Sequence, residues 1–276
     1  MIDLNEKPLC AIPRVMCWAV DNLELLKSQP NESVDLIYCD ILYGTGRKFK
    51  DYQDLKPKRE IIEEHYIPRI KQMHRILKDT GSIYLQMDTR INHWLRCVLD
   101  NIFGYDNFLN EISWCYNTGG KQKDKFATKH DVILFYSKSK TKTFNKVGIK
   151  RDTGSKSFGG KIGIDENGRQ YQDKKHKDKY YRYYLDVPKA AEDWWADFNN
   201  LHSQSKERVG YDTQKPKALI ERIIKASSNE GDLVADYYLG SGTTAEVCKE
   251  LNRNFIGCDI NPNAIELTKT RLNAGT

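Results

Sequence analysis

The chain has 276 residues, and its 44 Lys and Arg against 38 Asp and Glu give a net charge of +6 with neutral histidines. At roughly 100 to 200 residues per domain, this length predicts one large domain, or one core that carries a long insertion. No apolar run approaches the ~20 residues that span a bilayer, and the opening residues lack the basic start and apolar stretch of a signal peptide. We therefore expect neither a membrane protein nor a secreted one.

The seven cysteines are scattered along the chain without a CxxC pair. This spacing supports neither a disulfide framework nor a zinc knuckle, so we expect a reduced, cytoplasmic protein without a metal site. The positive charge is a modest excess, which permits a polyanionic partner without demonstrating one.

Strand and helix patterns alternate in the first half of the chain. Residues 34–39 form a continuous apolar run, which predicts a strand buried on both faces with Asp40 at its carboxyl end. The apolar spacing over 59–77 predicts a helix that Asp79, Thr80 and Gly81 terminate. The next predicted elements are a strand over 82–87, a helix over 91–103, and strands over 108–116 and 131–137. This alternation indicates an open, mostly parallel α/β sheet.

Residues 138–202 interrupt that alternation. Neither a helical nor a strand period persists there, and lysines alternate with aromatic residues, as in KKHKDKYYRYY. Two interpretations stay open: a solvated loop with its own aromatic cluster, or a nucleic-acid surface on which cations neutralise phosphates and rings stack on bases. We expect an insertion over 138–202, between core segments 1–137 and 203–276.

The α/β pattern returns after the insertion. It predicts a helix over 216–226, a strand over 232–236, a helix over 243–251, a strand over 255–259 and a final helix over 262–272. A glycine turn, Gly240-Ser241-Gly242, joins strand to helix, and Asp259 ends the next strand, where a carboxylate can accept both hydroxyls of a ribose. A dinucleotide site is possible by this geometry, although the turn lacks the third glycine of GxGxxG. A Walker A loop is excluded because its lysine is missing, and tight packing is the simpler interpretation.

Four ordered segments resemble one protein family. DLVADYYLGSGTTAEVCKELNRNFIGCDIN is similar to the AdoMet-binding region of amino-group DNA methyltransferases, and VDLIYCDILYGTGRKF to their catalytic Asp-Pro-Pro-Tyr loop. HDVILFYSKS resembles a later strand, and SKERVGYDTQKPKALIERII the segment before the glycine turn. The order, with the catalytic loop first, is that of the β class of adenine-N6 and cytosine-N4 enzymes. The resemblance implies a Rossmann-like AdoMet-dependent methyltransferase fold: a mostly parallel, twisted sheet with helices on both faces and an inserted target-recognition region.

The resemblance implies catalytic roles for Asp40, the Ile41 carbonyl and Tyr43. An exocyclic amine is a poor nucleophile because its lone pair is delocalised into the base. A carboxylate and a carbonyl that accept its two N–H bonds localise that lone pair toward the methyl sulfonium. Tyr43 would stack on a base rotated out of the duplex. Without the other motifs, the simpler interpretation would be a loop-capping carboxylate and a core aromatic residue.

The resemblance also implies an AdoMet site without a metal, because the sulfonium is already activated. Asp259 would bind the ribose, the glycine turn would face the methionine portion, and Asp236 would bind the methionine amino group or order the turn. Lys215 would pair with the methionine carboxylate, or is an ordinary surface lysine beside a helix start. The implied cofactor-binding residues are Thr213, Gln214, Lys215, Asp236, Tyr238, Gly240, Ser241, Gly242, Thr243, Thr244 and Asp259.

The catalytic loop departs from the family pattern. It reads Asp-Ile-Leu-Tyr, with Ile41 and Leu42 in place of two prolines that would fix the backbone, which leaves its geometry and its level of activity open. Similarly, Tyr237 and Tyr238 replace Pro-Phe. Asp at the first position of the loop resembles adenine-N6 enzymes, whereas Ser is commoner among cytosine-N4 enzymes.

We therefore predict a methyltransferase that flips and modifies adenine N6 in a specific sequence of double-stranded DNA. Three alternatives stay open: a cytosine-N4 enzyme, a catalytically impaired relative that binds DNA or a partner, and an enzyme for RNA or protein amides, against which the motif order argues. A homodimer and a cognate restriction endonuclease are further partners that the family allows; a membrane is not. The expected DNA contacts are Lys174, Lys175, Lys177, Tyr180 and Tyr181.

Overall fold

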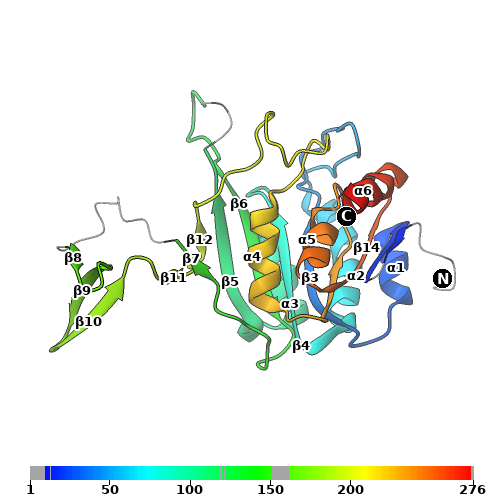
Figure 1. The fold of residues 1–276 in the computed structure, drawn as a ribbon. Helices are drawn as coiled ribbons and strands as arrows, with labels where there is room; N and C mark the ends of the chain where they lie inside the picture. The colour runs from blue at the N-terminus through cyan, green and yellow to red at the C-terminus, as the bar shows by residue number, and fades with distance from the viewer. Residues whose placement is uncertain (1–9, 13, 118–119, 121, 151–161, 275–276) are drawn as a thin grey trace. The chain divides into compact units, whose positions relative to one another are not determined.

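The computed structural model describes residues 10–12, 14–117, 120, 122–150 and 162–274 (Figure 1). Its contacts divide the chain into two compact units, one from residues 1–145 and 193–276 and the other from 146–192. The second unit is shorter than the predicted insertion over 138–202. Residues at both ends of that range belong to the first unit instead: the Lys138 N–H donates to the Gly81 carbonyl, and Trp194 pairs with Ser113 in its sheet.

The first unit contains a nine-stranded sheet in the order β1-β2-β14-β13-β3-β4-β6-β5-β12. The strands from β2 to β4 in this order are parallel, and β6 is antiparallel to β4. The predicted α/β fold with a mostly parallel sheet is confirmed. The strands are β1 (Cys10–Ile12), β2 (Val15–Ala19), β3 (Val34–Asp40), β4 (Leu77–Met87), β5 (Phe108–Cys115), β6 (His130–Ser137), β12 (Trp194–Trp195), β13 (Leu233–Asp236) and β14 (Asn254–Asp259).

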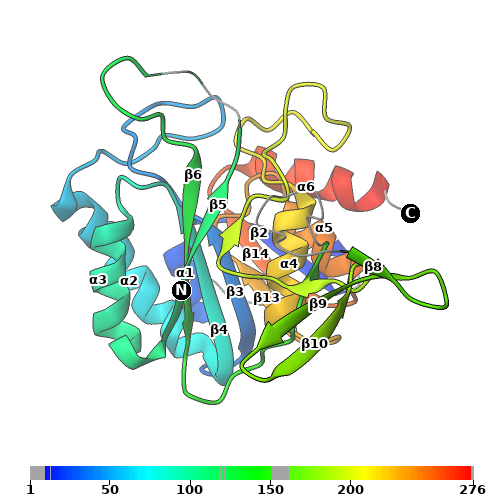
Figure 2. The ribbon, with the colours of Figure 1, turned by 90° about the vertical axis from the view of Figure 1, so that its left-hand side faces the viewer.

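Helices cover both faces of this sheet (Figure 2). The helices are α1 (Asn22–Ser28), α2 (Arg59–Ile76), α3 (Asn92–Phe103), the 3-10 turn η1 (Tyr105–Asn107), α4 (Lys217–Ser227), α5 (Thr243–Glu250) and α6 (Pro262–Ala274). In β3, Ile37 and Cys39 pack in the apolar cluster with α1, α2 and α3, whereas Leu36 and Tyr38 pack with α4, α5 and α6. The continuous apolar run of β3 is therefore explained by burial on both sides.

Two local features differ from the predictions. Strand β4 begins at Leu77, so the residues predicted to stop the helix lie inside a strand, where the pairing with β3 shifts register. Gly81 allows this irregularity, because a Cβ there would lie 2.9 Å from the Lys78 carbonyl oxygen. The amino-terminal elements β1, β2 and α1 were not predicted at all.

The second unit holds short strands where no persistent period was predicted. β8 (Ile162–Ile164), β9 (Gln170–His176) and β10 (Lys179–Tyr184) form an antiparallel sheet, and β7 (Gly148–Ile149) pairs with β11 (Lys189–Ala190). A two-residue turn joins β9 to β10, and Lys177 adopts a positive φ of 53° there. The basic and aromatic run of the sequence is therefore a β-hairpin.

Parallel pairing brings three acidic strand ends together. β13 lies between β14 and β3, which joins the two core segments that flank the insertion in sequence. These strands end at Asp259, Asp236 and Asp40. Because parallel strands share their carboxyl edge, the three carboxylates lie along one edge, where open α/β sheets bind ligands.

Candidate active site

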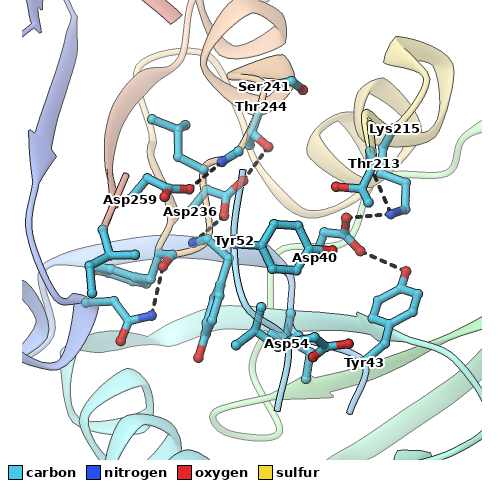
Figure 3. A pocket seen from close by; sticks show the side chains of 18 of the residues that line it. Asp40, Tyr43, Tyr52, Asp54, Thr213, Lys215, Asp236, Ser241, Thr244 and Asp259 are labelled. Atoms are coloured by element: carbon cyan, nitrogen blue, oxygen red, sulfur yellow. Dashed lines mark hydrogen bonds and ion pairs between the residues drawn. The ribbon is translucent and has the colours of Figure 1, made fainter. Parts of the chain in front are cut away.

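The carboxyl ends of these strands line a cavity of about 470 Å³ (Figure 3). The sequence-predicted residues that line it are Asp40, Ile41, Tyr43, Thr213, Lys215, Asp236, Tyr238, Gly240, Ser241, Thr243, Thr244 and Asp259. Gln214 and Gly242 do not line it. The Gln214 amide accepts from the Val209 N–H at 2.9 Å and donates to the Glu207 carbonyl at 2.7 Å, so it holds its own loop together.

Asp40, the last residue of β3, lines the cavity. Its Oδ2 accepts a hydrogen bond from the Lys215 ammonium at 2.5 Å, and its Oδ1 lies 2.8 Å from the Tyr43 hydroxyl. Burial raises the pKa of Asp40, the Lys215 charge opposes this rise, and the nearby Asp131 carboxylate adds to it. The Lys215 ammonium also lies 5.2 Å from the centroid of the Tyr43 ring. In this structure, Lys215 therefore binds the proposed catalytic carboxylate.

Tyr43 connects Asp40 to a second buried acid. Its hydroxyl lies 2.7 Å from Asp131 Oδ2, on β6. The Gln86 amide donates to the same oxygen at 3.0 Å, and the Tyr116 hydroxyl donates to Oδ1 at 3.0 Å. Asp131 is only 5% exposed, and its carboxylate is the acceptor in each of these hydrogen bonds. The site therefore contains an Asp40–Tyr43–Asp131 chain that the motifs alone did not reveal.

Hydrogen bonds hold the predicted catalytic loop, which lacks the two prolines. The Ile41 N–H donates to the Gln86 carbonyl at 3.1 Å, and the Leu42 carbonyl accepts from the Tyr66 hydroxyl at 2.9 Å. The buried Asp54 carboxylate accepts from the backbone N–H groups of Gly44 and Thr45. These bonds anchor the backbone on both sides of Leu42, so the loop is positioned without proline rings.

The glycine turn is tied to Asp236 and to the last helix. Asp236 Oδ2 accepts from the Thr244 hydroxyl at 2.6 Å, and its Oδ1 from the Tyr238 N–H at 3.0 Å. Burial raises the pKa of Asp236 to about 7, against these two hydrogen bonds. Arg271 of α6 donates to the Ser241 carbonyl and the Thr243 hydroxyl from the other side. The backbone around the turn is thus fixed before any ligand binds.

Asp259 faces the cavity beside an exposed apolar residue. Its Oδ2 accepts from the Gly240 N–H and its Oδ1 from the Asn261 N–H, both at 2.9 Å. Burial raises the pKa of this carboxyl. Each oxygen keeps a further lone pair, so the carboxylate can still accept from two hydroxyl groups. Ile260 next to it is 71% exposed and also lines the cavity, which offers an apolar surface beside the polar one.

Comparisons with known proteins identify the family. The model of a DNA methylase family, specific for N6 and N4 amino groups, matches residues 34–270. The chain belongs to the amino-group DNA methyltransferases. It is 32% identical to the type II methyltransferase M.HpaI of Haemophilus parainfluenzae, over 91% of this chain and 72% of that protein. It is also 32% identical to the DNA adenine methyltransferase YhdJ of Escherichia coli K12, over 93% and 82%, and to M1.MboII of Moraxella bovis, over 99% and 98%.

Solved structures of other methyltransferases share the fold. The cytosine-N4-specific PvuII DNA methyltransferase superposes with a TM-score of 0.69 at 18% identity, covering 98% of this chain and 90% of that one. M1.HpyAVI, solved as a complex with SAM, superposes with a TM-score of 0.55 at 20% identity, covering 94% and 100%. The predicted Rossmann-like methyltransferase fold is confirmed by these similarities.

Several cavity residues of this methyltransferase were not predicted from its sequence. Phe49 and Tyr52 stack on each other with ring centroids 4.8 Å apart, and both line the cavity together with Tyr211. His65 binds the Tyr238 hydroxyl at 3.1 Å, and burial lowers the pKa of this histidine to about 4. These residues come from loops and from a helix face, where no spacing rule singles them out.

The residues that the structure describes contain no group of three His, Cys, Asp or Glu side chains arranged to hold a metal ion. Within the same part of the chain, no helix combines the length and apolar character needed to cross a membrane.

Gly242→Ala is expected to destabilise this methyltransferase more than Gly231→Ala. Both glycines have positive φ, 73° and 84°, so alanine costs backbone strain of about 1 kcal/mol at either position. At Gly242 an added Cβ would also lie 2.3 Å from Oγ1 of the buried Thr268, whereas nothing lies within 4 Å at Gly231. Overpacking costs about 1–3 kcal/mol, and urea unfolding should show a difference of that size between the variants. Equal unfolding midpoints would contradict this account of the turn.

Proposed function

We propose that this methyltransferase transfers a methyl group from AdoMet to N6 of adenine in a specific sequence of double-stranded DNA. The Asp40 carboxylate in the cavity carries this proposal, because aspartate at the first position of the catalytic loop is typical of adenine-N6 enzymes. The name of YhdJ as a DNA adenine methyltransferase supports the same base. The cytosine-N4-specific PvuII enzyme shares only the fold at its level of identity, so it does not favour cytosine.

Asp40 and the Ile41 carbonyl would act on the target amine. When each accepts one N–H bond of the amine, the nitrogen becomes more tetrahedral and its lone pair points away from the base. AdoMet, once bound, would supply the methyl group. The nitrogen lone pair would form the new N–C bond, and the electron pair of the broken C–S bond would stay on sulfur. Lys215 keeps Asp40 oriented through Oδ2, and Oδ1, which accepts from the Tyr43 hydroxyl, keeps a second lone pair for the amine. Tyr43 offers the ring on which a flipped base would stack.

The cavity is suited to AdoMet. Its volume of about 470 Å³ lies within the range of roughly 300–1,000 Å³ that is usual for small-molecule sites. Asp259 has lone pairs to spare for the ribose hydroxyls, and Ile260 presents an apolar surface for the adenine ring. Asp236 is only 2% exposed, and its two oxygens accept from the Tyr238 N–H and the Thr244 hydroxyl, so we assign it to ordering the turn rather than to the methionine amino group. Lys215 is likewise reassigned from the methionine carboxylate to Asp40.

We assign DNA contacts to the β9–β10 hairpin, and its two faces differ in charge. Lys174 is paired in register with Tyr181, and Lys175 with Tyr180, so the two pairs lie on opposite faces. The Lys175 face also carries Asp173, which forms an ion pair with Arg182 at 2.8 Å. The Lys174 face has no acidic residue within the two strands. Because a carboxylate repels phosphates, the Lys174 face is the better DNA surface.

Changing Lys174, Lys175 and Lys177 together to alanine is expected to weaken DNA binding and to flatten its salt dependence. Each lost phosphate contact should reduce the slope of log K against log salt by up to about 0.9. AdoMet affinity should not change. Fluorescence titrations at several salt concentrations provide the measurement, and Lys27→Ala with Lys71→Ala, two exposed lysines on α1 and α2, provides the control. A slope equal to that of the control would return the hairpin to the solvated-loop interpretation.

Label transfer to DNA tests the proposed function. Purified protein, AdoMet with a labelled methyl group and unmethylated DNA are incubated, and the DNA is digested to nucleosides. We expect the label in N6-methyladenine. Label in N4-methylcytosine would make cytosine the target base in place of adenine, and an absence of label with normal AdoMet binding would favour the impaired relative.

The homodimer and the cognate endonuclease stay predictions, as does the cytoplasmic location that a DNA substrate and free cysteines favour.

A further inference from the structure

The Tyr43 hydroxyl lies between two carboxylates that it cannot serve as a donor at the same time. It is 2.8 Å from Asp40 Oδ1 and 2.7 Å from Asp131 Oδ2. A phenol carries one hydrogen, so it donates to one carboxylate and can bond the other only by accepting a hydrogen from it. The phenol hydrogen fills one of the two hydrogen-bond positions in the Asp40–Tyr43–Asp131 chain. The other position is vacant and can take up one additional proton.

The surroundings of Asp131 make it the acceptor end of this chain. Gln86 donates to Oδ2 and Tyr116 donates to Oδ1, so uncharged side chains hydrogen-bond both oxygens of the carboxylate. The Tyr38 hydroxyl donates to Gln86 Oε1 at 2.8 Å, which directs the Gln86 amide N–H groups toward Asp131. The charged groups around it among the described residues are Asp40 and, lining a neighbouring cavity, Asp88, Arg90 and Lys125.

At the other oxygen of Asp40, no such outlet exists. Oδ2 is held by the Lys215 ammonium, which donates hydrogen bonds and has no lone pair to accept a proton. Among the described neighbours of Asp40, the Tyr43 hydroxyl at Oδ1 is therefore the one that can take up a proton from it. Beyond Tyr43, Asp131 borders a second, partly open cavity of about 420 Å³.

The reaction requires an outlet of this kind. A nitrogen that keeps both hydrogens and gains a methyl group must release one proton to become the neutral methylated amine. We propose that Asp131 receives this proton through the Tyr43 hydroxyl and passes it to the second cavity; the inference rests on the proposed methyl transfer. Asp131 is thus a positioning residue that acts through Tyr43.

Each step of this relay balances. The N–H electron pair returns to nitrogen as the proton moves to Asp40. The Asp40 hydrogen then passes to the Tyr43 oxygen while the Tyr43 hydrogen passes to Asp131 Oδ2. Asp40 and Tyr43 are thereby restored, and Asp131 releases the proton to water in the second cavity. No other reactant is needed.

Single-turnover rates against pH, with saturating AdoMet and DNA, test the relay. Asp131→Asn should lower the plateau rate about tenfold, less than the loss of a group that contacts the amine, which is worth roughly a hundredfold or more. The acidic limb of the profile should move to lower pH, because Asp131 raises the pKa of Asp40 and the variant lacks that charge. Tyr116→Phe is the matched control: it removes a hydrogen bond to Asp131 outside the relay and should leave the limb in place.

Two further variants keep the test decisive if Asp131→Asn folds poorly. Tyr43→Phe keeps the ring and both carboxyls but interrupts the relay, so it should lower the rate to a similar extent. In Asp131→Ala, added formate should restore most of the lost rate, because a small carboxylate can enter the second cavity. An unchanged rate and pH profile in Asp131→Asn, or an Asp131→Ala variant whose lost rate formate does not restore, would overturn the proposal.

A measurement on the free protein separates this inference from the proposed function. Carbon-13 NMR of labelled aspartate, with Asp40→Asn to assign the signal, follows the titration of Asp40 without AdoMet or DNA. Its pKa should fall in Asp131→Asn and rise in Tyr43→Phe, which loses a hydrogen bond that lowers it. An unchanged Asp40 titration in both variants would overturn the relay. A wild-type protein that modifies no DNA would instead refute the proposed function.

Discussion

Asp40→Asn is expected to abolish methyl transfer while AdoMet affinity stays nearly unchanged. In the proposed mechanism the carboxylate accepts from the target amine, whereas the proposed cofactor residues Asp236 and Asp259 lie at the ends of β13 and β14. Losing a group that accepts an N–H bond in the transition state costs roughly a hundredfold to ten-thousandfold in rate. Asparagine preserves the volume of the side chain. With its amide oxygen held by Lys215, its NH2 group takes the place of Oδ1 and cannot accept the N–H bond of the amine.

Single-turnover transfer and calorimetric AdoMet binding measure the two effects separately. Asp79→Asn is the matched control, because it makes the same change at an exposed position near the amino end of β4. Asp40→Ala is a poorer test, since it leaves the largely buried Lys215 ammonium without its carboxylate, a loss that costs about 3–5 kcal/mol of stability. Wild-type transfer by Asp40→Asn would require an active site elsewhere.

Asp259→Ala is expected to weaken AdoMet binding by about 1–3 kcal/mol, or roughly 5-fold to 150-fold. The variant leaves the ribose hydroxyls without an acceptor. It also frees the Gly240 and Asn261 N–H groups that hold the turn against β14. Calorimetry compares the variant with Asp79→Ala, whose affinity should match that of the wild type. Equal affinity in Asp259→Ala would remove this carboxylate from the cofactor site.

The sequence was sufficient to predict the core because its strands are locally distinctive. The runs that end at Asp40, Asp236 and Asp259 are apolar, short and followed by helices, and parallel pairing then brings their carboxyl ends to one edge. The β9–β10 hairpin was harder to predict, because its turn at Lys177 and Asp178 contains none of the glycine or asparagine residues that mark such turns. Because both faces of its strands carry exposed lysines, the sequence also lacks the alternation of apolar and polar residues that predicts a strand.

Contacts between distant segments account for what the sequence analysis missed in the site. Asp131 was part of a quoted motif, yet its approach to Tyr43 depends on β6 pairing with β4 beside β3. Lys215 was predicted to bind the cofactor because its motif precedes the glycine turn, whereas its contact with Asp40, made from the loop before α4, was not predicted. Neither contact follows from spacing along the chain, because each joins residues that are more than 80 positions apart.

The most direct test of the account is a comparison of DNA from bacterial cells that express either the wild-type protein or Asp40→Asn, in a host without adenine methylation of its own. Equal expression is verified, and single-molecule sequencing locates every modified base. We predict N6-methyladenine at one recurring sequence in the wild-type cells and none in the cells with Asp40→Asn. Modified cytosine at that sequence, or equal adenine methylation with the variant, would contradict the account.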